Sequence, residues 1–171
     1  MGGPPMAFLP PEVVAEIEAL RARYPQSRSA MLPALKAIQR HYRWVPPEAR
    51  REVAGLLGIY PAQVEDVVSF YVLLNERPAG KYVIDVCTNI ACLLVGGVEL
   101  LEHLEQTLGI KSGGTTADGL FTLRDAECLG ACGAAPVLEV NQELYENLTV
   151  AKVDTLIANL RAGNGPDYAE P

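Results

Sequence analysis

The chain of 171 residues has only four cysteines, two histidines and one tryptophan, so any metal or thiol chemistry depends on few residues. No apolar run approaches the ~20 residues of a membrane-spanning helix, and the N-terminus lacks the basic and apolar regions of a secretory signal. No G-x-G-x-x-G, Walker A or G-x-S-x-G motif is present. We therefore predict a soluble cytosolic protein that holds no complete nucleotide-binding or hydrolytic site of its own.

Basic clusters are also scarce, particularly in the second half of the chain. Of the net charge of −7, residues 1–78 contribute 9 basic and 8 acidic side chains, whereas residues 79–171 contribute 5 and 13. Binding to nucleic acid depends on clustered Lys and Arg. We therefore predict no nucleic-acid partner.

The hydrophobic periodicity changes once, in the turn-rich segment 76–80. Before it, apolar residues recur every three or four positions, as in short helices. After it, the pattern is that of a mixed α/β layer, with expected strands at Tyr82–Val86 and Leu120–Ala126, a helix at Gly97–Leu108, a hairpin over 136–145, and a last helix capped by Thr149 and ended by Gly163.

This order predicts an α+β chain. We expect an N-terminal helical bundle at 1–78, a thioredoxin-like α/β domain at 79–163 and a disordered tail at 164–171. The C-x-x-C motif of catalytic thioredoxins is absent, so thiol–disulfide exchange by that mechanism loses its main support.

The four cysteines form two pairs, and each pair follows a predicted strand. Cys87 and Cys92 make a C-x4-C motif, and Cys128 and Cys132 make a C-x3-C motif. If the two strands are neighbours, both pairs lie at the same edge of the sheet. In a reducing compartment such thiols bind metal or do redox chemistry more often than they form structural disulfides.

The spacing of the cysteines is compatible with more than one bound group. A [2Fe-2S] cluster takes four thiolates, two per iron, and tolerates varied spacing. Structural zinc prefers closely spaced cysteine pairs in a small module that zinc keeps folded. Cysteines that bind nothing or form disulfides are the third possibility. His41 and His103 are interpreted as packing or surface residues, because neither is paired with another candidate ligand.

The two cysteine motifs and one segment between them form a longer pattern. Its parts are Cys87-Thr88-Asn89-x-x-Cys92, Asp118-Gly119-x-Phe121, and Glu127-Cys128-Leu129-Gly130-Ala131-Cys132-x-x-Ala135-Pro136. Together they resemble the signature of the thioredoxin-like [2Fe-2S] subunit (the E subunit) of bacterial NADH:quinone oxidoreductase, respiratory complex I. The likeness extends upstream through Val68-Ser69-Phe70-Tyr71 and covers roughly residues 11–162.

The resemblance implies an electron-transfer subunit of that oxidoreductase, with Cys87, Cys92, Cys128 and Cys132 as the ligands of one [2Fe-2S] cluster. It implies that NADH and FMN are bound by a partner flavoprotein subunit in the larger peripheral arm, and that the cluster exchanges single electrons with the FMN. The expected location is the cytoplasmic face of the inner membrane, reached through the complex. The near-neutral helical half, with Trp44 and Tyr60, is the expected contact region.

Alternatives remain at this point. The same subunit type occurs in NAD-linked hydrogenases and formate dehydrogenases, and a zinc-stabilised interaction adaptor is a reading from another class. A homodimer of the isolated chain is also retained. Many relatives have proline and arginine where this chain has Ala91 and Val95. Neither position is a ligand, so the difference concerns the conformation of the loop around Cys92 or a contact with the flavoprotein subunit.

Two finer expectations concern the surroundings of the cysteines. Thioredoxin-like folds often hold a cis proline facing the active loop, so we predict a cis bond at Ala135–Pro136. An acidic surround made by Asp85, Asp125 and Glu127 disfavours adding an electron to a thiolate-bound cluster, which predicts a low reduction potential.

Overall fold

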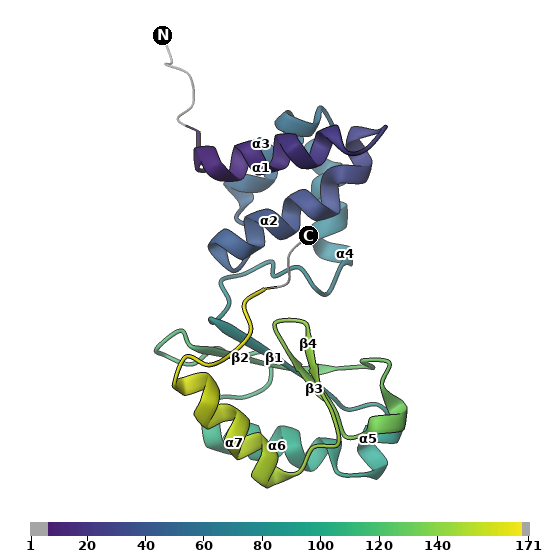
Figure 1. The fold of residues 1–171 in the computed structure, drawn as a ribbon, viewed down its shortest axis with the longest axis vertical. Coiled ribbons are helices and arrows are strands. Elements are labelled where there is room, and N and C mark those ends of the chain that lie inside the picture. Colours follow the sequence, from purple (N-terminus) through teal and green to yellow (C-terminus); the bar gives the residue numbers. More distant parts are fainter. Residues whose placement is uncertain (1–6, 169–171) are drawn as a thin grey trace. The chain divides into compact units, whose positions relative to one another are not determined.

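The computed structural model describes residues 7–168, shown in Figure 1. The chain divides into two compact units, with the boundary between Pro78 and Ala79. Each unit has its own core of buried apolar side chains. Within residues 7–168, every helix is too short or too polar to cross a lipid bilayer.

Between residues 7 and 78 the structure has four α-helices, as the periodicity predicts: α1 (Pro11–Ala22), α2 (Met31–Tyr42), α3 (Pro47–Leu57) and α4 (Pro61–Phe70). Three of them begin with proline, which is tolerated in a first turn because its missing N–H needs no partner there. Helix α3 ends at Gly58, whose φ of 65° lies in the left-handed region that glycine adopts without strain. The helices share one apolar core, which includes Ile17, Leu35, Ile38, Val53 and Val64.

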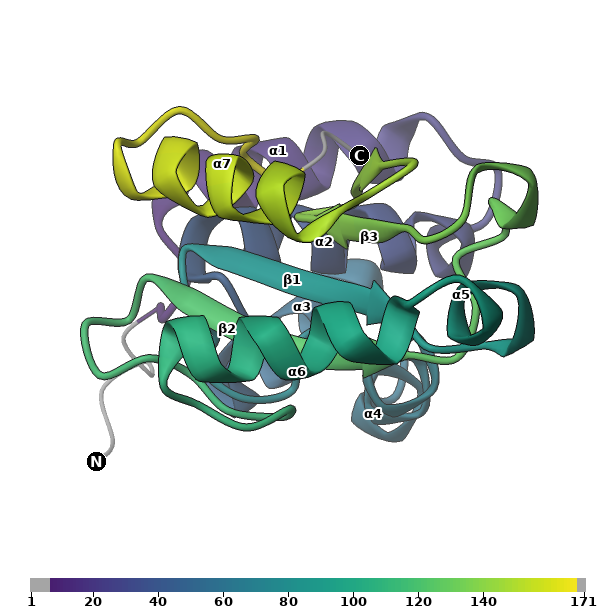
Figure 2. The same ribbon diagram turned by 90° about the horizontal axis from the view of Figure 1, so that it is seen from below.

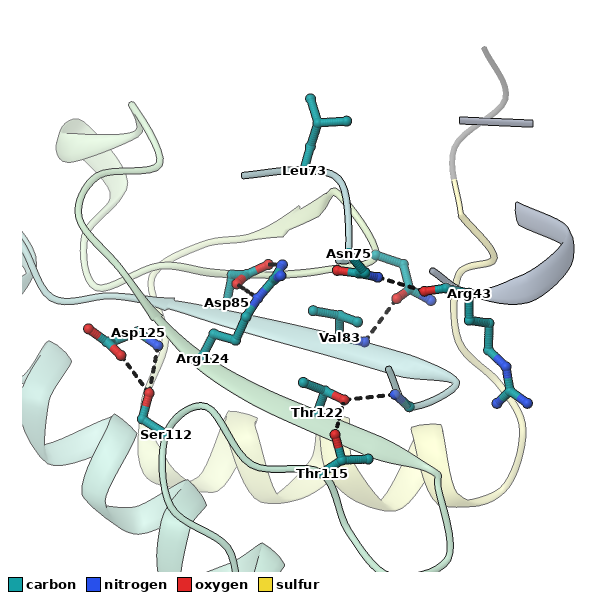
Figure 3. Close-up of polar contacts among 12 residues, drawn as sticks. Arg43, Leu73, Asn75, Val83, Asp85, Ser112, Thr115, Thr122, Arg124 and Asp125 are labelled. Carbon is teal, nitrogen blue, oxygen red and sulfur yellow. Dashed lines mark hydrogen bonds and ion pairs between the residues drawn. The ribbon is translucent and has the colours of Figure 1, made fainter. Parts of the chain in front are cut away.

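Buried polar contacts fix the segment that follows α4. The side chain of Gln39 donates to the carbonyl of Leu73 at 2.7 Å and accepts from the backbone N–H of Asn75 at 2.6 Å. The Asn75 amide in turn donates to the carbonyl of Arg43 at 2.8 Å (Figure 3). The chain therefore leaves the helical unit along a defined path. Of the aromatic residues expected at a partner contact, Tyr60 is 79% exposed and Trp44 is half-buried.

Within residues 79–168 a four-stranded sheet has the order β2-β1-β3-β4. Its strands are β1 (Tyr82–Cys87), β2 (Phe121–Ala126), β3 (Leu138–Val140) and β4 (Glu143–Tyr145). Strand β1 is parallel to β2 and antiparallel to β3, and β3 pairs with β4 as the predicted hairpin. The predicted strands and hairpin are confirmed within one or two residues.

Helices α6 (Gly97–Leu108) and α7 (Val150–Arg161) cover one face of this sheet (Figures 1 and 2). Alternate residues of β1, namely Tyr82, Ile84 and Val86, point into the core beneath the helices. Val83, Asp85 and Cys87 therefore lie on the opposite face. The bounds of α6 agree with the prediction, and Thr149 caps α7 by accepting from the N–H of Lys152.

The predicted disordered tail, 164–171, lies partly outside the described residues. In its described part, 164–168, the carbonyl of Pro166 accepts a hydrogen bond from the side chain of Asn141 at 2.8 Å. Asn141 is buried, and its side-chain oxygen also accepts from the backbone N–H of Val83. The start of this segment is thus held against the turn that joins β3 to β4.

Candidate metal centre

Both cysteine pairs lie at the carboxyl ends of the parallel strands β1 and β2. Cys87 is the last residue of β1, and the parallel register places it beside Ala126, the last residue of β2. Cys128 follows two residues later. Parallel strands present their carboxyl ends at the same edge of a sheet, which confirms that neighbouring strands deliver both pairs to one place.

Cys92 lies on a short helix rather than in a loop. Helix α5 spans Ile90–Leu94, and the side chain of Asn89 caps it by accepting from the N–H of Ile90 at 2.7 Å. This helix is not among the elements predicted from the sequence. Five residues are too few to reveal helical periodicity, and the N-cap preference of Asn89 is the one local signal that could have indicated the helix.

The start of α6 packs directly on the first pair, because Gly97 has no side chain. A Cβ at this position would lie 2.8 Å from the carbonyl oxygen of Cys87 and 2.9 Å from that of Cys92. Such contacts with backbone atoms would require the chain to move. Gly97 therefore positions both cysteines against α6, a role that the sequence pattern did not reveal.

The second pair lies in an exposed loop. Gly130 has a φ of 76°, and its N–H points at the sulfur of Cys128, 3.4 Å away. Cys132 begins a short 3-10 turn whose last residue, Ala134, accepts a hydrogen bond from the N–H of Asn147 at 2.7 Å. The Ala135–Pro136 bond that follows is cis, as predicted.

The four thiols come together, and all four are free. The sulfur of Cys87 lies 3.9 Å from the carbonyl oxygen of Glu127 and interacts with the thiols of Cys92 and Cys128. Cys92 interacts electrostatically with Cys132. The two pairs are therefore neighbours in space, although 35 residues separate them along the chain.

The first pair has opposite pKa shifts. Burial raises the pKa of the Cys87 thiol, but backbone hydrogen bonds from Asn89 and Leu129, with the thiols of Cys92 and Cys128, outweigh burial and leave the pKa below its ordinary value. Burial and the adjacent Cys87 raise the pKa of Cys92. In the metal-free protein Cys87 is therefore the first of the two to ionise.

These residues fit an iron–sulfur cluster by the chemistry of their donors. Four cysteine sulfurs can bind a single zinc ion or an iron–sulfur cluster. A [2Fe-2S] cluster is broader and distributes four thiolates over two irons. Apolar side chains around Cys87 and Cys92, among them Val137 and Leu129, exclude water from that side of the site.

The acidic residues near the cysteines are partly neutralised. Asp85 forms a bidentate ion pair with Arg124, whose Nε and Nη2 lie 2.6 and 2.7 Å from the two carboxylate oxygens. Because the parallel register places Arg124 directly opposite Asp85, the acidic surround expected near the cysteines loses most of the negative charge of this residue. The low reduction potential expected from that surround stays a prediction. A hydrogen bond from Ser112 holds the pKa of Asp125 below its usual value, so that carboxylate stays ionised (Figure 3).

Both histidines lie on the surface layer of the molecule, as interpreted from the sequence. His41 is exposed and packs edge-on against Tyr42. His103 on α6 contacts the carboxylate of Asp154 on α7 at 2.6 Å.

The sheet, its two covering helices and the gathered thiols define an α/β iron–sulfur module. A family model described as thioredoxin-like [2Fe-2S] ferredoxin matches residues 17–161. The chain belongs to this family, and its cofactor is one [2Fe-2S] cluster.

The chain is also similar to individual members of known enzyme complexes. The chain is 45% identical over 147 residues to the second E-type subunit of NADH-quinone oxidoreductase from Rhizobium meliloti, covering 86% of this chain and 88% of that protein. It is 43% identical over 150 residues to NADH-quinone oxidoreductase subunit 2 of Thermus thermophilus, covering 86% and 83%.

A solved structure shares the fold at lower identity. It is the air-oxidised state of an NAD+-reducing [NiFe]-hydrogenase, with a TM-score of 0.67 and 23% identity. The match covers 80% of this chain but only 25% of the hydrogenase chain. It supports the arrangement of helices and strands.

Proposed function

We propose that this chain is the [2Fe-2S] electron-transfer subunit, of the E type, of an NADH-quinone oxidoreductase. The observation that carries the proposal is the convergence of two cysteine pairs at the ends of β1 and β2. Family membership and the identity of 43–45% to named subunits support it.

Cys87, Cys92, Cys128 and Cys132 would hold the cluster as thiolates. When bound, the cluster accepts and returns one electron at a time. The chain supplies N–H donors to the sulfurs, from Asn89 and Leu129 to Cys87 and from Gly130 to Cys128, and such hydrogen bonds favour the charged thiolate.

The partner in this proposal is a flavoprotein subunit that binds NADH and FMN. A nicotinamide transfers a hydride, whereas an iron–sulfur cluster handles single electrons, so the flavin must stand between them. This chain then contributes to oxidoreductase activity only within the complex. Its proposed place is the cytoplasmic face of the membrane that holds the complex.

Metal analysis of the full chain, purified without oxygen, tests the cofactor. About two irons and two sulfides per chain, with a reducible visible chromophore, are expected. Stoichiometric zinc without sulfide would overturn the proposal in favour of a zinc-stabilised adaptor.

Co-purification tests the partner. The chain is co-expressed with an NADH-oxidising flavoprotein subunit from the same organism, and NADH is then added under anaerobic conditions. We expect NADH to bleach the chromophore of the complex but not that of the chain alone. Recovery with hydrogenase or formate dehydrogenase subunits instead would assign the chain to one of those enzymes.

A further inference from the structure

The sheet face opposite α6 and α7 carries a row of three charged side chains. Asp85 on β1 lies beside Arg124 on β2 and beside Glu139 on β3. Arg124 donates from Nε and Nη2 to the two carboxylate oxygens of Asp85 (Figure 3). The Asp85 side chain is only 14% exposed, which protects this pair from water better than an ordinary surface ion pair.

This row reaches the cysteine site. Asp85 precedes Cys87 by two residues on the same face of β1, a separation of about 7 Å along the strand. Arg124 lies diagonally across the β1–β2 ladder from Cys87, at a similar distance. Both charges therefore lie within the ~8–10 Å over which charges act before salt screens them. While they remain paired, their fields at Cys87 largely cancel.

We infer that Arg124 tunes the reduction potential of the cluster by neutralising Asp85. The inference rests on the proposed function, because it assumes that Cys87 is a cluster ligand. Reduction adds one electron from an external donor and transfers no proton or group, so the cluster gains one negative charge. A bare carboxylate at Asp85 opposes that gain, and the guanidinium of Arg124 removes the opposition. Arg124 acts through Asp85 and is a positioning residue.

A thermodynamic cycle of midpoint potentials tests this role. The full chain is reconstituted anaerobically and titrated with dithionite, and the reduced cluster is followed by electron paramagnetic resonance. We expect Arg124→Gln to lower the midpoint potential and Asp85→Asn to raise it. The double variant Asp85→Asn/Arg124→Gln should return close to the wild-type value, because the two substitutions remove opposite charges from one pair.

Arg161→Gln is the matched control, since it removes the same charge from the same unit. Arg161 lies over the ring of Phe121, with its guanidinium 5.8 Å from the ring centroid. Phe121 begins β2, so this position is about 16 Å along the strand from the end that carries the cysteines. We expect no change in midpoint potential there, because salt screens exposed charges beyond ~10 Å.

The outcomes separate this inference from the proposed function. A wild-type chain that binds no iron and sulfide overturns both. A cluster whose potential is not lowered by Arg124→Gln, or a double variant that does not return toward wild type, overturns the inference alone. If Arg124→Gln does not fold, Asp85→Asn and the double variant decide: an upward shift in the first and a near wild-type value in the second are the supporting results.

Discussion

The two cysteine pairs occupy different kinds of structure. Cys87 and Cys92 are 3% and 2% exposed, at the end of β1 and on α5, and Gly97 of α6 packs on both. Cys128 and Cys132 are exposed in a loop. The first pair is therefore part of the packed protein, whereas the second pair lies at the surface and should depend more on the cluster for its arrangement.

Removal of one cysteine from each pair should give the largest effects. Cys92→Ala and Cys128→Ala should each abolish cluster assembly, because either leaves an iron without its ligand. The metal-free proteins should differ: Cys92→Ala should lose about 1 kcal/mol of unfolding free energy, and Cys128→Ala less than about 0.5 kcal/mol. Visible absorption measures the cluster, and urea unfolding measures stability.

Either cysteine would leave the list of ligands if its variant kept an unchanged chromophore. Equal stability losses in the two metal-free variants would contradict the contrast between a packed pair and a loop pair.

Gly97→Ala should lower the free energy of unfolding by about 1–3 kcal/mol, because the added Cβ meets the backbone oxygens of Cys87 and Cys92. Alanine is the better helix former by about 1 kcal/mol, so a net loss shows that the close contact outweighs helix propensity. Guanidinium unfolding of the metal-free chain, together with iron content after reconstitution, measures the effect.

Gly133→Ala provides the control beside the second pair. A Cβ at Gly133 would meet no atom within 4 Å, and its φ is not in the left-handed region. We expect a change within about 0.5 kcal/mol. A Gly97→Ala chain as stable as the Gly133→Ala chain would refute the positioning role of Gly97.

The smallest effect concerns pH. Burial and the neighbouring Asp85 raise the pKa of Glu139, which lies next to the strand that carries the first pair. A carboxyl with a raised folded pKa stabilises the protein fully below its unfolded pKa of about 4.3, and this contribution is lost as the pH rises through the folded pKa. Glu139→Gln should therefore raise the melting temperature at pH 7, which corresponds to a gain of less than about 1 kcal/mol in the free energy of unfolding. At pH 4 the variant and the wild type should not differ.

Melting curves from pH 4 to pH 8 measure this difference. Glu127→Gln, at an exposed position beside the second pair, is the control and should follow wild type throughout. A Glu139→Gln chain less stable than wild type at pH 7 would show that Glu139 is held by a favourable contact that outweighs its burial.

Several elements could be predicted because their signals are local. Apolar repeats indicated α1 to α4, and Gly97 and Gly109 bracket an amphipathic run whose predicted bounds agree with α6. Alternation indicated β1 and β2, and a polar turn indicated the β3–β4 hairpin. Helix α5 was missed because its five residues complete little more than one turn.

The sequence by itself determined which atoms are available: two spaced pairs of thiols, each following a strand, in a chain with few other ligands. Only the tertiary structure decided that these pairs meet, since a parallel register between strands some 40 residues apart in the chain is not encoded in any local pattern. The same register placed Arg124 against Asp85, and Gly97 became a contact point through the packing of α6. Long-range pairing, rather than local propensity, therefore sets both the geometry and the charge of the site.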